Sequence, residues 1–100
     1  MGDHRTNVRV TNVVDLEDEE ITKIEGLDDA WIFIKEIWLS KNLITTIEGL
    51  NRCKNLVYLD LQTNRITKID DGAFDGLVNL EELYLDGNQI KKIENLEPLV

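Results

Sequence analysis

The chain has 100 residues, of which 42% are hydrophobic, and its 20 acidic against 11 basic side chains give a formal net charge of -9 at pH 7. This length suits a single domain. The negative charge argues against nucleic acid as a partner, because phosphates would be repelled, and favours a basic protein surface or simple solubility. The lone cysteine, Cys53, excludes an intrachain disulfide and a cysteine-based zinc site.

The first third of the chain is expected to be a flexible N-terminal segment followed by a cap. Residues 1–7 are polar, and we expect them to be flexible. The opening Met-Gly-x-x-x-Thr matches a loose N-myristoylation pattern at Gly2, with an unmodified Gly2 as the simpler alternative. Residues 8–33 combine apolar positions with an acidic run at 17–20. This mixture is typical of a terminal cap joined to a degenerate first repeat.

From residue 34 onward, one pattern recurs three times. The stretch from Leu56 to Ile69 reads L-x-x-L-x-L-x-x-N-x-I-x-x-I, which fits neither a helical period nor a strand period along its whole length. The predicted repeats span residues 34–55, 56–79 and 80–100. The asparagines of the pattern, 22 and 24 residues apart, are Asn42, Asn64 and Asn88. A pattern that returns at this interval indicates a solenoid.

This pattern resembles that of leucine-rich repeat proteins. Repeats that end in IEGL or IENL, with a 22-residue step, most resemble the intracellular branch typified by the protein phosphatase 1 regulatory subunits. The resemblance implies an α/β-type repeat solenoid, a right-handed leucine-rich-repeat superhelix with a short parallel sheet on its concave face and loops or 3-10 turns on its convex face. Each x-L-x-L-x piece should form a short strand, with the motif leucines and isoleucines buried. No divergent polar cap follows the third repeat.

The asparagines of the pattern require a separate explanation. A tight turn after each strand leaves backbone donors and acceptors facing inward, and a buried unpaired group costs about 1–3 kcal/mol. A carboxamide offers two donors and an acceptor, so it can pair with these backbone groups. We therefore expect a structural ladder of hydrogen bonds rather than ligand contacts at Asn42, Asn64 and Asn88.

The sequence contains no constellation suited to catalysis. His4 lies in the polar start, Cys53 takes an apolar position of its repeat, and Ser40 has no histidine partner in the pattern. Phosphate-loop, dinucleotide and zincin motifs are absent. We expect no enzyme activity, no cofactor and no metal. Because no signal peptide, glycosylation sequon or long apolar run is visible, we expect a cytoplasmic protein, with the nucleus as an alternative and no membrane partner.

The outward positions of the predicted strands gather acidic and aromatic side chains on the concave face. Trp38 and Tyr84 share one column with Asp60 between them, and Tyr58 lies in the neighbouring column. Exposed aromatics are enriched in binding hot spots, and acidic surroundings suit a Lys or Arg of a partner. The resemblance to the phosphatase regulators implies the same use, since those proteins hold their partner through acidic and aromatic residues of this face. The alternative is that the rings only pack against one another. The candidate binding residues are Glu36, Trp38, Tyr58, Asp60, Gln62, Glu82, Tyr84 and Asp86.

The sequence thus predicts a non-catalytic protein-protein interaction module that binds a protein or peptide, with basic residues, on its concave face. The alternative is a self-assembling scaffold, or a fragment of a longer repeat array, that associates through the uncapped C-terminal end. An apolar end with an unpaired strand edge favours such association. The residues expected at this contact are Leu96, Leu99 and Val100.

Overall fold

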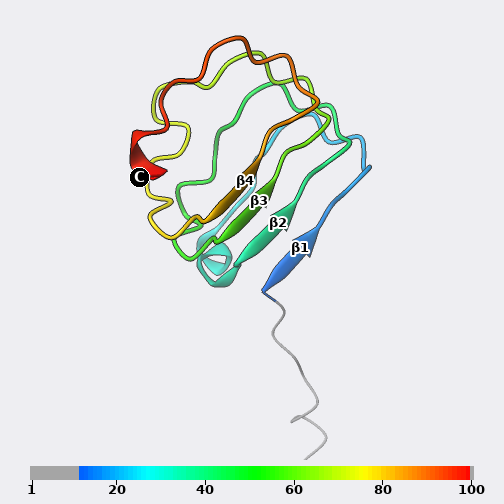
Figure 1. Ribbon diagram of the computed structural model, residues 1–100. Helices are drawn as coiled ribbons and strands as arrows, with labels where there is room; N and C mark the ends of the chain where they lie inside the picture. Colours follow the sequence, from blue (N-terminus) through cyan, green and yellow to red (C-terminus); the bar gives the residue numbers. More distant parts are fainter. Residues whose placement is uncertain (1–11, 100) are drawn as a thin grey trace, which may run out of the picture.

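The computed structural model of the protein describes residues 12–99. These residues form one sheet and two 3-10 helices (Figure 1). The strands are β1 (Val13–Asp15), β2 (Glu36–Trp38), β3 (Tyr58–Asp60) and β4 (Glu82–Tyr84), and the 3-10 helices are η2 (Asp29–Phe33) and η3 (Glu97–Leu99). The expectations for residues 1–7, for Gly2 and for Val100 lie outside the described residues. No helix in the described part of the chain is long and apolar enough to cross a membrane.

All four strands run parallel, in chain order from β1 to β4. Equivalent residues pair across the sheet, because Val14 lies beside Ile37, Ile37 beside Leu59, and Leu59 beside Leu83. These positions are 23, 22 and 24 residues apart. Parallel neighbours cannot be joined by a tight hairpin, so each strand continues into a loop that returns around the other side of its coil (Figure 1). The predicted repeat solenoid with a short parallel sheet is confirmed.

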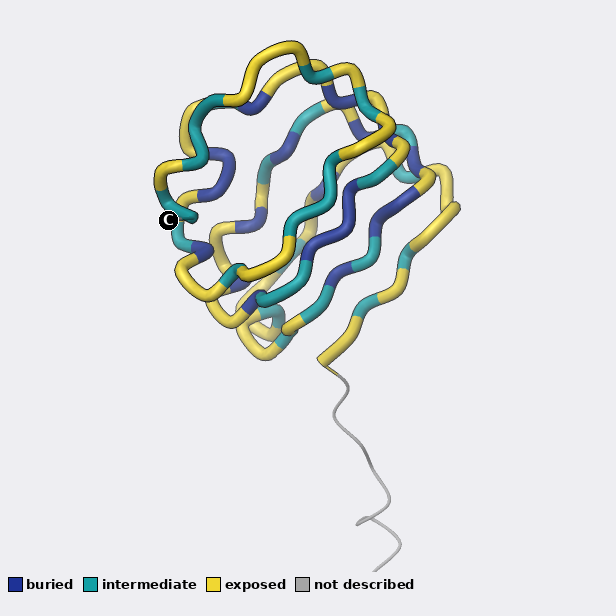
Figure 2. Tube along the Cα trace, in the orientation of Figure 1, coloured by how far each residue is buried: buried dark blue, intermediate teal, exposed yellow. Residues whose placement is uncertain are grey.

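The core lies inside the coils, between the sheet and the return segments. Side chains alternate across each strand, so the motif leucines and isoleucines point inward while their neighbours point outward. Burial is deepest in the two central coils and shallower on β1 and on the last coil (Figure 2). Phe74 and Cys53 complete the core from the return segments, and both are fully buried. The buried motif residues are Ile37, Leu39, Ile44, Ile47, Leu50, Leu56, Leu59, Leu61, Ile66, Ile69 and Leu77.

Asparagine side chains connect successive coils. Asn64 donates through Nδ2 to the carbonyls of Leu61, at 3.1 Å in its own coil, and of Leu39, at 3.0 Å in the preceding coil. Its Oδ1 accepts from the N–H of Ile44, also in the preceding coil, at 3.0 Å. The side chains of Asn42 and Asn88 form the same kinds of hydrogen bond one coil earlier and one coil later. The three asparagines therefore form a continuous hydrogen-bonded ladder along the solenoid.

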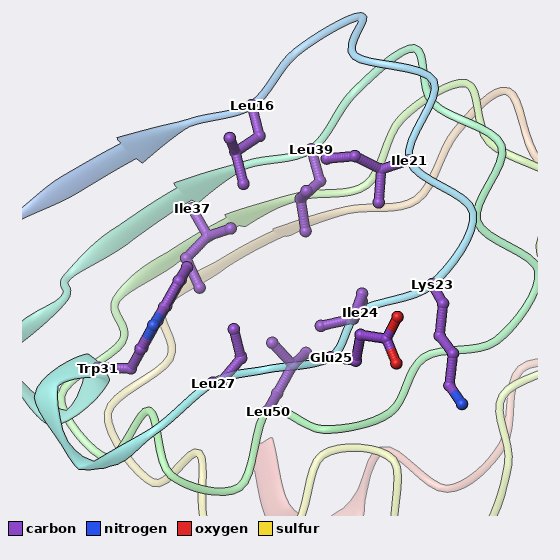
Figure 3. A pocket seen from close by; sticks show the side chains of 10 residues that line it. All are labelled: Leu16, Ile21, Lys23, Ile24, Glu25, Leu27, Trp31, Ile37, Leu39 and Leu50. Atoms are coloured by element: carbon purple, nitrogen blue, oxygen red, sulfur yellow. The ribbon is translucent and has the colours of Figure 1, made fainter.

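The first coil is packed less tightly than the central ones. An apolar cavity of about 250 Å³ remains inside it (Figure 3). Trp31 of η2 and leucines and isoleucines from the first two coils line this cavity, with Lys23 and Glu25 at its side. No described coil lies beyond β1 to fill the space, so Leu16 and Ile21 are only half-buried.

The difference in burial between coils predicts a graded response to truncation. Leu59→Ala should lower the free energy of unfolding by roughly 2–5 kcal/mol, because this side chain is fully buried in a central coil. Leu83→Ala removes the equivalent residue of β4, which is half-buried, and should cost less. Urea denaturation followed by circular dichroism measures both losses. Equal losses at the two positions would contradict this account of the core.

Candidate functional site: the concave face of the sheet

The outward side of the sheet, called here the concave face, carries columns of side chains, and two of these columns lie on β2, β3 and β4 themselves. Trp38, Asp60 and Tyr84 lie side by side in one column. The other column consists of Glu36, Tyr58 and Glu82. The parallel register, with no offset between strands, brings these six residues together. A third column, one step further along, consists of Ser40, Gln62 and Asp86, and the backbone N–H groups of Lys41 and Thr63 donate to the carbonyls of Gln62 and Asp86.

The three aromatic rings form a row across the strands. The Trp38 and Tyr58 rings are stacked, with centroids 5.0 Å apart and planes at 29°. Tyr58 and Tyr84 have centroids 5.3 Å apart and are tilted by 46°. Such offset and tilted arrangements are the favourable ones for aromatic pairs. The rings therefore do pack against one another, and each of the three residues nevertheless remains partly exposed to solvent.

Two carboxylates fix the orientation of the outer rings. The indole Nε1 of Trp38 donates to Glu36 Oε1 at 3.1 Å, and the Tyr84 hydroxyl donates to Glu82 Oε1 at 2.8 Å. In both pairs the partners are two residues apart, so they lie on the same face of one strand. A carboxylate with one oxygen held in this way still has acceptor sites for a partner molecule.

The prediction that Asp60 is exposed at the centre of the site is wrong. Only 4% of this residue is accessible, because Trp38 and Tyr84 flank it on the neighbouring strands. Its Oδ1 accepts from the backbone N–H of Gln62 at 3.0 Å. Asp60 therefore contributes negative charge from beneath the aromatic residues, and it offers little surface for direct contact.

The remaining candidate residues lie toward the edges of this face. Gln62 is half-buried and Asp86 is exposed. Ser40, at an outward position of the repeat pattern, is buried, and its hydroxyl donates to Glu17 Oε1 at 2.7 Å. Glu17 was not among the predicted site residues, although its position one coil before Ser40 in the same column indicated this contact. The acidic surface therefore extends onto the first coil.

The arrangement raises the pKa of both phenols and so favours their protonated form. Partial burial raises the pKa of Tyr58, and the nearby charges of Asp60, Glu82 and Glu36 raise it further. The hydrogen bond to Glu82 is the main reason that the pKa of Tyr84 is raised. Both hydroxyls consequently remain hydrogen-bond donors. Burial also raises the pKa of the Cys53 thiol, which keeps it in its unreactive protonated form.

The described residues contain no arrangement suited to holding a metal. No group of three or more His, Cys, Asp or Glu side chains within residues 12–99 is placed to bind an ion. The concave face instead combines flat apolar rings with carboxylates. Its chemistry is that of recognition through stacking, cation-π contact and hydrogen bonding.

The raised tyrosine pKa values predict a shifted phenolate titration. Tyr58 and Tyr84 are the two tyrosines of the chain, so near-ultraviolet absorbance reports them alone. In the folded protein both should ionise above the usual pKa of 10.0. Because the folded state holds these protons more tightly, their contribution to stability is complete below that pKa and is lost as pH rises through the folded values.

A matched pair of variants tests the cause of this shift. Glu82→Gln should lower the pKa of Tyr84 toward its usual value, because it removes the charged acceptor. Glu81→Gln removes the same charge from the adjacent exposed residue, and should have a smaller effect. Ionisation of both phenols at the pH found for the unfolded chain would contradict the hydrogen-bonded arrangement.

Known proteins share this repeat and this fold. The family model described as leucine rich repeat matches residues 34–90. The protein phosphatase 1 regulatory inhibitor subunit PPP1R7 homolog of Arabidopsis thaliana is 35% identical over 81 residues, which are 81% of this chain and 24% of that protein. The probable U2 small nuclear ribonucleoprotein A' of Drosophila melanogaster is 33% identical over 87 residues, covering 87% of this chain and 33% of that protein.

A solved structure gives the same picture. The crystal structure of an internalin from Listeria monocytogenes superposes with a TM-score of 0.59 and 27% sequence identity, over 70% of this chain and 20% of that chain. The chain thus spans a third or less of the length of each of these proteins. Because the family match covers more than half of its residues and its coils place the motif leucines inside, the chain belongs to the leucine-rich repeat family.

Proposed function

We propose that this protein is a non-catalytic interaction module that binds a protein or peptide with basic side chains on its concave face. Leucine-rich repeat proteins generally mediate protein-protein interactions. The observation that carries the proposal is the row of three partly exposed rings, Trp38, Tyr58 and Tyr84, held among carboxylates. Rings that pack only for stability do not need an acidic surround, whereas a site for cations does.

The geometry supports recognition of a lysine or arginine side chain. A cation placed over an aromatic ring gains about 0.5–1 kcal/mol at an exposed site, and about 2 kcal/mol or more when water is excluded. Glu36 and Glu82 lie beside the rings and can accept hydrogen bonds from the same cation. Asp60 adds negative potential from below. Because hydrogen bonds already orient Trp38 and Tyr84, little side-chain entropy is lost when a partner binds.

The relatives support a regulatory or assembly role for this module. One is named as a regulatory inhibitor subunit of a phosphatase, and another as a ribonucleoprotein component. Neither name describes the leucine-rich protein itself as an enzyme. An intracellular location fits these relatives, in the cytoplasm or, as the ribonucleoprotein name suggests, in the nucleus.

The aromatic row can be tested with a double variant. Trp38→Ala combined with Tyr84→Ala should weaken binding of an arginine-rich peptide by at least about tenfold, as measured by fluorescence polarisation, because two hot-spot side chains are lost. The same loss should appear in a pull-down from source cells. The ring contacts contribute roughly 0.5–1.5 kcal/mol per pair, so the variant should remain folded. Raising the salt concentration should weaken binding to the unchanged protein.

Ile93→Ala provides the matched control, since this side chain is 74% exposed and lies outside the concave face. It should bind the peptide as the unchanged protein does. If the aromatic double variant also binds with unchanged affinity, the proposed site is wrong. If the double variant unfolds instead, the rings belong to the core and the proposal fails as well.

A second candidate function, self-assembly, is favoured by the last coil. Ile93 is 74% exposed, although the equivalent residues Ile47 and Ile69 are almost completely buried. The N–H of Leu61 donates to the next coil, whereas no described coil lies beyond β4 to accept from the N–H of Leu85. A coil from a second copy, or from a longer array, would cover Ile93 and would accept the hydrogen bond of the Leu85 N–H.

Self-assembly predicts a molecular mass that rises with concentration in light scattering. Ile93→Asp and Leu99→Asp should each reduce that mass, because they place a charge on the apolar end. Leu99 packs partly on the core, so Leu99→Asp could also destabilise the fold. Ile93 is mostly exposed, and Ile93→Asp therefore tests association without this effect. A monomer at high protein concentration would contradict this candidate function, and the aromatic double variant should not alter the mass.

A further inference from the structure

A second surface lies on the segments that lead into the strands, outside the concave face. Ile32, Lys54 and Val78 each stand two residues before the residue that opens the next repeat, so they occupy equivalent positions in three consecutive coils. Phe33 follows Ile32 at the end of η2. We call these four residues the rim stripe. No part of the proposed concave site uses them.

The rim stripe contains most of the exposed large apolar side chains of the described residues. There are five such side chains in all, Val13, Ile32, Phe33, Val78 and Ile93, and three belong to the stripe. Phe33 is 63% exposed, and Val78 is 74% exposed. Single exposed apolar residues are ordinary, but a cluster of them on one surface marks an interaction site.

The backbone beneath the stripe is fixed from coil to coil. Asn55 Nδ2 donates to the carbonyl of Ile32 at 2.8 Å, and Asn79 Nδ2 donates to the carbonyl of Lys54 at 3.0 Å. Phe33 stands at the position that Asn55 and Asn79 occupy in the later coils. The first of these positions thus carries an exposed ring in place of a hydrogen-bonding amide. The stripe is a preorganised surface, which lowers the entropic cost of binding.

The charged residues around a hollow at this surface, Arg52 and Lys54 against Asp29, have a net charge of +1, whereas the whole chain is acidic. A hollow of about 530 Å³ lies here, lined by Asp29, Ile32, Phe33, Asn51, Arg52 and Lys54. Arg52 is paired with Asp29 across the coils. Lys54 has no carboxylate partner among the described residues, whose ion pairs involve other cations. A Cβ at Gly76 would lie 3.1 Å from Lys54 Nζ, so the absence of a side chain there leaves room for this ammonium group.

We propose that the rim stripe binds an acidic, apolar segment of a protein partner. A carboxylate of that segment would pair with Lys54. Apolar side chains of the segment would cover Ile32 and Phe33 on one side of Lys54, and Val78 on the other. This preference is the reverse of the one assigned to the concave face, where aromatic rings lie among carboxylates. The protein can therefore hold two partners of opposite charge on two separate surfaces.

Three synthetic peptides of equal length test this proposal by fluorescence polarisation with the full chain. The first alternates leucine with glutamate, the second replaces each glutamate by lysine, and the third replaces each leucine by serine. The leucine-glutamate peptide should bind at least about tenfold more tightly than the serine peptide, and Phe33→Ser and Lys54→Glu should each weaken its binding about tenfold. The leucine-lysine peptide should not bind this surface.

Matched controls make the same chemical changes elsewhere. Ile93→Ser and Lys91→Glu alter exposed residues outside the stripe and should leave the affinity unchanged. The aromatic double variant of the concave face should also keep it, so this proposal and the proposed function fail separately. Three results would overturn the inference: affinity for the leucine-glutamate peptide that is unchanged in Phe33→Ser and Lys54→Glu, no binding of that peptide at all, or equal binding of the leucine-lysine peptide to the aromatic double variant, whose concave site is removed. A change of oligomeric state in Phe33→Ser would also overturn it, by making a second copy the occupant.

Discussion

The structure depends on amide side chains that join each coil to the one before it. Asn64 is nearly inaccessible to water and satisfies the carbonyls of Leu39 and Leu61 together with the N–H of Ile44. Without these bonds, several polar backbone groups would be buried unpaired, at a cost of about 1–3 kcal/mol each. Because Asn64 bonds both to its own coil, at Leu61, and to the preceding coil, at Leu39 and Ile44, the stacking of coils and the tight turn after each strand are stabilised together.

This constraint explains how two proposed binding surfaces can share so small a core. The ladder of asparagines and the leucines inside the coils set the strand register, and the register places outward residues in straight columns. The residues in those columns can carry charge and aromatic rings, since the buried leucines, isoleucines and asparagines already hold the coils together. The segments before the strands have a second set of amide bonds, from Asn55 and Asn79, that fixes the rim in the same manner.

Much of this fold could be predicted from the spacing of apolar residues, which determines both strand positions and buried side chains. The same spacing also predicted that Trp38 and Tyr84 share one column of the sheet. The burial of Asp60 did not, because it depends on how the side chains of adjacent strands lie over it. The ring orientations depend on local hydrogen bonds to carboxylates two residues away. The rim stripe was overlooked because its residues, such as Phe33, fall outside the recurring motif.

The coils differ in length, with steps of 23, 22 and 24 residues, yet the strands remain aligned without offset. All of the variation is therefore absorbed on the far side of each loop, around Gly72 and Phe74 in the longest coil. Evolution, or a protein engineer, can lengthen or graft these return segments while the concave face keeps its geometry. Changes in size and changes in specificity thus belong to different sides of the same molecule and can be made independently.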